Sequence, residues 1–230
     1  MTTAVDHAST ITLFKGGHSD GPVPGDPDCQ MCLFEAYNWL RQPSGKLTDA
    51  CPLDVSPVLH TFGMRLNDAL DDVRRQQLVR FLPNGGPSPL SGTRDDGLDE
   101  TRSYMALDWL IRTYTPAWLD LAGLTAEATA LRDLRRIVDL VAAQQAGPVV
   151  RAGQVKAAAA RAAAGAAAGA AAGDAAWAAA WDAAGAAAWA AARDAAGAAA
   201  RDKLQPTVGL LQVSAIALFE AMIRPELVTS

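Results

Sequence analysis

The amino-acid sequence predicts an all-α fold, an irregular multi-helix bundle that carries a long alanine-rich helix or helical hairpin. After residue 25, apolar residues recur at steps of three and four, as they do along one face of an α-helix. No segment shows the alternation of apolar and polar residues that demands a β-strand. Residues 161–203 are mostly alanine, which is the strongest helix former.

N-cap residues followed by proline mark three of the predicted helix starts. Asp26, Ser56 and Thr115 suit the N-cap position, and the proline after each one fits the first helical turn. Asp71 or Asp72 can cap a further helix, while clusters of glycine and proline mark the breaks between helices. The predicted helices span residues 27–43, 57–70, 72–82, 99–111, 116–123, 125–147 and 206–225.

The composition along the chain predicts three parts. Residues 1–25 are rich in Gly, Ser, Thr and Pro, so we expect a mobile tail in which residues 11–14 dock as a short extended piece. Residues 26–150 form the helical core. Residues 151–230 form an alanine-rich arm that ends in a C-terminal docking helix.

In the arm, glycine or tryptophan recurs among the alanines at steps of four residues. A step of four residues overshoots one helical turn by about 40°, so a stripe of every fourth residue winds slowly around the helix. The tryptophans of this stripe provide apolar anchoring, and its glycines let another backbone come close. We therefore predict a packing surface, although the repeat also fits a helical filler. The residues of this surface are Trp177, Trp181, Trp189, Gly165, Gly169 and Gly173. Gly173 followed by Asp174 favours a break that makes two antiparallel helices.

Composition limits the classes of function. The chain has 230 residues and a net charge of −5, which argues against non-specific binding to nucleic acid. It shows neither a signal peptide nor a strongly apolar span of membrane length, so we expect a soluble, cytoplasmic protein without a membrane partner. Three cysteines fit a reducing compartment better than a disulfide framework.

Polar residues embedded in apolar helix faces form the candidate binding site. Buried carboxylates need partners, and nearby arginines such as Arg112 are available. One interpretation is an internal network of salt bridges and helix caps. The other is an acidic site that holds a metal ion or a basic ligand. The set comprises Glu35, Asp49, Asn67, Asp68 and Asp108, with Arg112.

No catalytic residue is predicted. The chain has no nucleophile elbow, phosphate-binding glycine loop or metalloprotease helix. Cys29, Cys32, Cys51 and His60 are zinc-ligand types, but only the first pair has the spacing of ligands. Cysteines at positions i and i+3 of a helix also act as small core residues. We predict no metal and no cofactor.

Several motifs carry a family resemblance. In order they are Cys32-Leu33-Phe34-Glu35-Ala36, Ser56-Pro57-Val58-Leu59, Asn67-Asp68, Asp108-Trp109-Leu110-Ile111-Arg112 and Thr115-Pro116-Ala117-Trp118-Leu119. Together with the arm repeat, they resemble a family of uncharacterised proteins from actinobacteria and their phages. The resemblance covers most of the chain after Gly25 and implies a shared fold and a bacterial or phage cytoplasmic setting. It implies no activity. Cys29 and Cys51 lie outside the family pattern, which counts against zinc.

These observations favour a non-enzymatic helical protein that contacts a protein partner, or a second copy of itself, through the alanine-rich arm. One alternative is an enzyme or a ligand- or metal-binding protein that uses the acidic set. Another is a phage or bacterial immunity or anti-defence protein that binds its target through an acidic surface.

Overall fold

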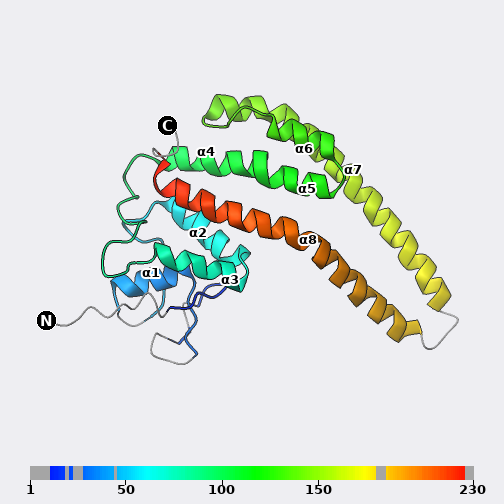
Figure 1. Ribbon diagram of the computed structural model, residues 1–230, viewed down its shortest axis with the longest axis horizontal. Helices are drawn as coiled ribbons and strands as arrows, with labels where there is room; N and C mark the ends of the chain where they lie inside the picture. The colour runs from blue at the N-terminus through cyan, green and yellow to red at the C-terminus, as the bar shows by residue number, and fades with distance from the viewer. Residues whose placement is uncertain (1–10, 19–20, 23–27, 44–45, 180–184, 226–230) are drawn as a thin grey trace. The chain divides into compact units, whose positions relative to one another are not determined.

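The computed structural model describes residues 11–18, 21–22, 28–43, 46–179 and 185–225, and for residues 161, 163–179 and 185–201 it describes the backbone alone (Figure 1). Helices make up the regular structure of this part of the chain, which confirms the predicted all-α class. Its β-structure is a single isolated bridge between Leu13 and Met31. This bridge confirms that residues 11–14 dock as an extended piece.

The chain divides into two compact units. Unit 1 comprises residues 1–106 and 212–230, and unit 2 comprises residues 107–211. The division falls within helices α4 (Asp99–Trp109) and α8 (Gly185–Ile223), whereas the sequence places boundaries at residues 25 and 150.

Unit 1 contains four short helical elements besides its portions of α4 and α8. They are α1 (Leu33–Arg41), α2 (Pro57–Ala69), α3 (Asp72–Arg75) and a 3-10 helix η2 (Gln76–Phe81). Two predicted caps are confirmed: Ser56 Oγ accepts hydrogen bonds from the Val58 and Leu59 N–H groups, and Asp71 accepts one from the Arg74 N–H. Local sequence therefore fixes the starts of α2 and α3.

The start of α1 differs from the prediction. Asp26 and Pro27 lie outside the described residues, and the chain from residue 28 to Cys32 is not helical. Cys32 is the N-cap, and Glu35 in the first turn accepts a hydrogen bond from the Cys32 N–H at 2.9 Å. A carboxylate three residues after the cap satisfies a free N–H group at the helix end. Cys29 therefore precedes the helix, and the predicted placement of Cys29 and Cys32 on one helical face is wrong.

The core of unit 1 forms around the end of α8. Phe219 and Met222 have no exposed surface, and the Phe219 ring meets Phe81 edge to face with ring centres 5.1 Å apart. Gly63 of α2 makes room for this packing, because a Cβ atom at this position would lie 2.9 Å from the Phe34 ring and 3.0 Å from the Phe219 ring. The predicted inward face of the last helix is thus confirmed at Phe219 and Met222.

A buried arginine holds three segments of unit 1 together. Arg102 of α4 has no exposed surface, and its guanidinium donates hydrogen bonds to the carbonyl oxygens of Met222 (2.9 Å) and Thr93 (3.2 Å). It also contacts the carboxylates of Asp96 (2.5 Å) and Asp99 (3.2 Å). A third carbonyl, that of Ile223, lies 3.4 Å from the guanidinium. Two carboxylates and three carbonyls thus surround one buried cation, which is the arrangement a buried charge requires.

This network predicts a stability loss in acid. The hydrogen bond from Arg102 holds the pKa of the Asp96 carboxyl below its ordinary value. Unfolded Asp96 therefore binds a proton at a higher pH than folded Asp96 does. The stability that Asp96 contributes is present above about pH 4, the ordinary range of aspartate, and is lost as the pH falls through the lower folded pKa.

Urea unfolding at pH 7 and at pH 3 checks this expectation in the wild type and in Asp96→Asn. The substitution removes one titrating group and leaves the other carboxylates in place. We expect the variant to lose less stability than the wild type between the two pH values. Equal losses would show that Asp96 does not contribute to the acid sensitivity.

Unit 2 contains the end of α4, a π-helix η3 (Leu110–Tyr114), α5 (Thr115–Leu121), α6 (Thr125–Arg132), α7 (Leu140–Ala179) and the first part of α8. Leu119, Ala128 and Leu131 form its buried cluster. Val149 and Val150 of α7 pack against this cluster.

Thr115-Pro116 does not open a separate helix, contrary to the prediction. The backbone stays helical from Asp99 to Leu121, passing through the π-helix. Proline has no N–H group and interrupts the regular hydrogen-bond ladder. Here the Thr115 N–H and the Thr115 hydroxyl both donate to the Leu110 carbonyl, the latter at 2.7 Å. The wider π turn thus lets the chain pass Pro116 without a break.

The predicted helix over residues 125–147 is also wrong. Helix α6 ends at Arg132, and α7 begins at Leu140 after a non-helical stretch. Asp139 Oδ1 accepts a hydrogen bond from the Ala142 N–H at 2.7 Å, so an aspartate again marks a helix start. Because apolar residues keep a helical spacing across this stretch, the sequence does not indicate the break between α6 and α7.

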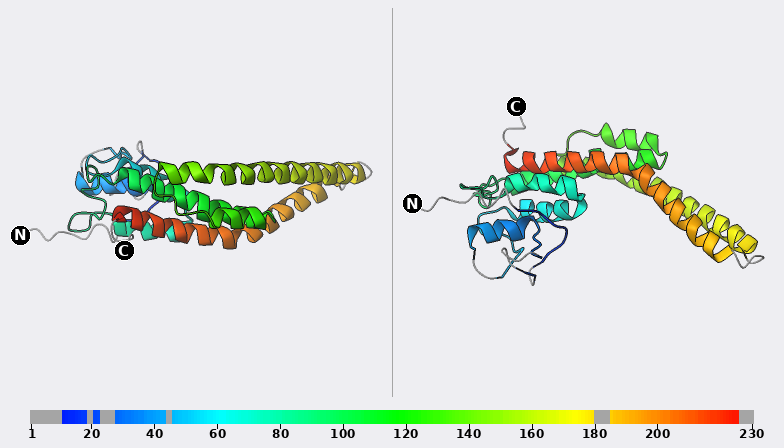
Figure 2. Two further views of the ribbon diagram at one scale, coloured as in Figure 1. Left: turned by 90° about the horizontal axis from the view of Figure 1, so that it is seen from above. Right: turned by 60° about the horizontal axis from the view of Figure 1, so that its bottom comes forward.

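Helices α7 and α8 run in opposite directions (Figures 1 and 2). Neither Gly147-Pro148 nor Gly173 ends α7, and Pro206 lies inside α8 rather than at a helix start, so three predicted boundaries are wrong. One glycine costs a helix only about 1 kcal/mol, which a run of alanines offsets.

The predicted packing residues lie in this arm. Gly165, Gly169, Gly173 and Trp177 lie in α7, and Trp189 lies in α8. The side chains of Trp177 and Trp189, and the whole of Trp181, lie outside the described part of the structure. Their predicted anchoring role stays a prediction.

Part of α8 has the length and apolar character of a membrane span. By composition alone, Asp202–Ile223 is the one such helix among the described residues, and 33% of its most apolar window is buried within the structure. Core helices of globular units meet the same criterion. Phe219 and Met222 in this segment form the core of unit 1.

Candidate functional site

Four of the five predicted polar residues come together in unit 1, around residues 13–18. We call these residues, Leu13-Phe14-Lys15-Gly16-Gly17-His18, the strap. The four residues are Glu35 of α1, Asn67 and Asp68 of α2, and Asp49 from the connection between these helices. The sequence predicts that residues 11–14 of the tail dock, and Leu13 is accordingly 1% exposed. The hydrogen-bonded contacts continue beyond the predicted piece to His18.

Asn67 and Asp68 bind the main chain of the strap. The Asn67 amide donates to the Phe14 carbonyl at 2.8 Å, and its oxygen accepts from the Leu33 N–H at 3.2 Å. Asp68 Oδ1 accepts a hydrogen bond from the Gly16 N–H at 2.8 Å. One buried amide therefore links the strap to the start of α1.

Glu35 and Asp49 surround the end of the strap. The Glu35 carboxylate has no exposed surface and accepts a hydrogen bond from the His18 N–H. Its other oxygen lies 3.2 Å from the His18 Nδ1. A Cβ atom at Gly17 would lie 3.2 Å from the Asp49 carboxylate. A larger residue at position 17 would require this carboxylate to shift by a few tenths of an ångström.

Two further residues complete the site, and sequence reasoning missed both. Gln76 binds both main-chain groups of Leu13: its oxygen accepts from the Leu13 N–H at 2.8 Å, and its amide donates to the Leu13 carbonyl at 2.9 Å. The Phe14 N–H donates to the Met31 carbonyl at 2.8 Å. The two adjacent glycines after an apolar pair were the sequence signal for a segment that must fit a narrow space.

This geometry supports the first interpretation of the acidic set for its unit 1 members, namely an internal binding and capping network. Glu35, Asn67 and Asp68 bind main-chain groups, and Glu35 also pairs with the His18 ring, rather than the arginines that the sequence suggested. Among the described residues, no group of three or more His, Cys, Asp or Glu side chains is placed to hold a metal ion.

The predicted zinc-ligand types are separated in the structure. His60 Nε2 lies 2.8 Å from the Asp49 carbonyl, and the His60 ring packs on Phe34 with ring centres 4.5 Å apart. Burial raises the pKa of the Cys32 thiol to about 12. Burial also raises the pKa of the Cys51 thiol, against the opposing effect of Arg94. Both thiols therefore stay protonated at neutral pH, a form that is a poor metal ligand and a poor nucleophile.

Asp108 and Arg112 belong to unit 2 and form a separate contact. Asp108 Oδ1 accepts a hydrogen bond from the Ile137 N–H at 2.8 Å and lies 3.4 Å from Arg112. Arg112 also donates to the Arg132 carbonyl at 3.3 Å. This pair fastens the stretch between α6 and α7 to the helix that carries both residues.

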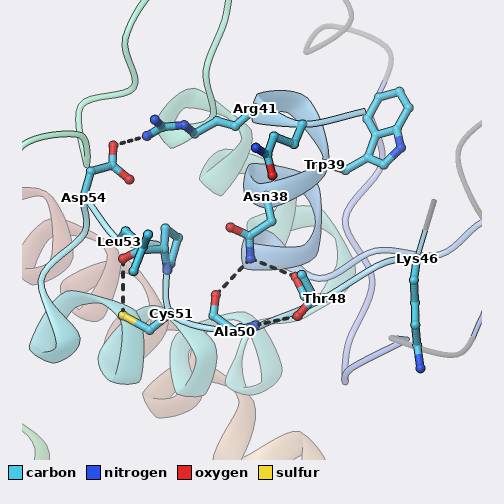
Figure 3. Close-up of a pocket in the computed structure, with 11 residues that line it drawn as sticks. Asn38, Trp39, Arg41, Lys46, Thr48, Ala50, Cys51, Leu53 and Asp54 are labelled. Atoms are coloured by element: carbon cyan, nitrogen blue, oxygen red, sulfur yellow. Dashed lines mark hydrogen bonds and ion pairs between the residues drawn. The ribbon is translucent and has the colours of Figure 1, made fainter. Parts of the chain in front are cut away.

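A polar pocket of about 450 Å³ lies beside the end of α1 (Figure 3). The Asn38 amide donates to the Thr48 and Ala50 carbonyls at 2.9 Å each, and Arg41 pairs with Asp54 across the opening. The polar groups of Asn38, Arg41 and Asp54 are thus engaged in holding the loop that forms the wall of the pocket. The pocket has a protonated thiol, Cys51, but no histidine or carboxylate paired with it as a base.

A second pocket, of about 440 Å³, lies in unit 2 between α5 and α7 and is mainly apolar. Its lining includes Tyr114, Trp118 and Ala157. The Thr115 hydroxyl, also in the lining, already donates to the Leu110 carbonyl. The Trp118 indole N–H is fully buried, so a ligand in the pocket cannot reach it. The pocket therefore offers apolar surface with little to orient a polar ligand.

Comparison with models of protein families, with curated proteins and with solved structures finds no match to this chain. No activity can be transferred from a relative. Function must then be inferred from the surfaces that the structure describes.

Proposed function

We propose that this chain is a non-enzymatic helical interaction protein that associates with a second copy of itself through α7. The observation that supports the proposal is a helix with two apolar sides. One side of α7 packs within unit 2, where Ala142 and Ala146 are buried and Val149 and Val150 contact the buried cluster.

The opposite side of α7 is exposed and carries apolar residues, with the exposed Gln144 and Gln145 between the first two of them. Its residues recur at steps of three, four and seven, which keeps them on one face of the helix. Val141 and Val155 are 60% and 69% exposed. This stripe comprises Val141, Pro148, Ala152, Val155, Ala159 and Ala162, all of them exposed. A helix that is apolar on both sides is normally buried on both sides.

The composition of the stripe favours another helix as the partner. Small residues between the two valines let a second backbone approach closely, while the valines supply apolar area. The same stripe on two copies is self-complementary, so a two-fold contact between them is the simplest closed assembly. The sequence prediction that Trp177, Trp181 and Trp189 anchor the arm is kept as part of this proposal. No cofactor, nucleic acid or membrane enters this proposal, and the setting that it assumes is cytoplasmic.

Light scattering after size exclusion tests the proposal. We expect the wild type to have about twice the 24.0 kDa mass of one chain. The variant Val141→Asp with Val155→Asp places two charges in the contact and should return to the mass of one chain, because burying an unpaired carboxylate is unfavourable. Gln154→Asp is the matched control, since Gln154 is exposed on the same helix but lies about 100° away from Val155.

A wild-type mass of one chain at high concentration would contradict self-association. A paired form that survives both aspartates would show that the stripe is not the contact. A further variant with alanine at Trp177, Trp181 and Trp189 tests the arm separately. A fall in mass in this variant would assign part of the anchoring to the indole rings.

A further inference from the structure

The strap is bound as a peptide ligand is bound, through its main chain. Each of the Leu13, Phe14, Gly16 and His18 N–H groups donates to a group of unit 1 outside the strap. The Leu13 and Phe14 carbonyls accept from the Gln76 and Asn67 amides. In peptide recognition, main-chain hydrogen bonds give affinity and side-chain pockets give specificity.

Four positions of the strap carry specific requirements. The Leu13 side chain is buried. Gly16 has φ +89°, a conformation that favours glycine, and Gly17 lies against the Asp49 carboxylate. The His18 ring faces Glu35 at 3.2 Å. Lys15 is exposed, so its side chain is not among these requirements.

The strap and the residues that surround it carry opposite charges. The strap contains Lys15 and His18 and no acidic residue, whereas Glu35, Asp49 and Asp68 surround it. Carboxylates placed around a basic segment favour its association and disfavour acidic competitors.

We propose that unit 1 contains a peptide-binding groove for the pattern Leu-x-x-Gly-Gly-His, which the strap occupies in cis as a displaceable ligand. The groove is formed by Met31, Glu35, Asp49, Asn67, Asp68 and Gln76. Its partner in trans is an extended segment with the same pattern on another protein. The strap joins the rest of unit 1 through residues 19–28, whose prolines and glycines are typical of a linker. A tethered ligand has a high effective concentration, so the strap normally excludes competitors.

The test uses a fluorescent peptide of residues 11–18 and the full-length chain. In Leu13→Asp, the aspartate cannot enter the apolar site, so the strap leaves and the groove opens. We expect the peptide to bind this variant at least about tenfold more tightly than it binds the wild type, where the tethered strap competes. The matched control is the same peptide with aspartate in place of its leucine, which should not bind.

A second groove variant tests the recognition itself. Gln76→Ala, added to Leu13→Asp, removes two hydrogen bonds to the peptide. At about 1 kcal/mol each, their loss should weaken binding by at least about tenfold. If Leu13→Asp does not fold, Gly17→Asp replaces it, because its carboxylate would meet those of Asp49 and Glu35.

Hydrogen exchange gives a readout that needs no variant. An excess of the peptide should speed exchange of the Phe14, Gly16 and His18 amides in the wild type by displacing the strap. Three results would overturn the proposal. They are no peptide binding to a folded strap variant, equal binding of the control peptide, or unchanged exchange of these amides at saturating peptide. Because the groove lies in unit 1 and the stripe on α7, failure here leaves the proposed self-association unaffected.

Discussion

Replacing Arg102 by methionine is expected to lower the free energy of unfolding of unit 1 by about 3–5 kcal/mol. Methionine keeps much of the side-chain volume and removes the charge. It leaves the Met222 and Thr93 carbonyls without their donor and Asp96 without its buried partner. Each orphaned buried group costs free energy, so the loss exceeds that of an ordinary ion pair. Urea unfolding followed by circular dichroism measures the effect.

Arg80→Met is the matched control for this measurement. Arg80 pairs with Glu220 at 2.7 Å and so also joins an early segment of unit 1 to α8. Its side chain is 44% exposed, and an exposed pair contributes at most about 1 kcal/mol. Similar losses in the two variants would show that burial of Arg102 does not set its contribution.

Phe219→Ala is expected to reduce the stability of unit 1 by about 3–5 kcal/mol, the usual cost of removing a buried ring. The ring fills the space beside Gly63 and contacts Phe81 and Phe62, so its loss leaves a cavity bounded by α2, η2 and α8. Neighbouring rings hold this space open, and it cannot collapse fully. Thermal and urea unfolding both report the change.

Val213→Ala provides the comparison on the same helix. Val213 is 54% exposed and belongs to unit 1, so we expect a change within about 0.5 kcal/mol. A loss of less than about 1 kcal/mol for Phe219→Ala would contradict the assignment of this ring to the core.

Sequence reasoning succeeded where structure is decided locally. Ser56 and Asp71 cap the helices that follow them, because the bonds they make span two or three residues. It failed where a local signal competes with a longer-range effect. Pro148 and Pro206 lie inside long helices, although proline lacks an N–H group and disfavours a helix interior. Next to Pro148, Val149 and Val150 pack against the buried cluster of unit 2, a contact that the local sequence does not reveal.

The site was predictable in part. Polar groups in apolar faces, such as Glu35 and Asn67, identified buried side chains that need partners, and the structure gives them partners. The identity of those partners was not predictable. The strap is distant in sequence, and main-chain N–H groups occur at nearly every residue, so no sequence pattern marks the ones that bind. From the sequence alone, Gln76 resembles an exposed helical residue. Only the fold shows that it binds Leu13. Arg102 shows the same limit, since two of its acceptors lie at the other end of the chain.

Unit 1 is assembled from both ends of the sequence, with the whole of unit 2 between them. A ribosome adds about 5–20 residues per second, so roughly a hundred intervening residues delay the final helix by about 5–20 s. During translation residues 1–106 of unit 1 emerge without Phe219 and Met222, and their apolar side chains lack their last packing partners. We therefore expect nascent chains stalled before Gln212 to engage chaperones that bind apolar segments, and completed chains to release them.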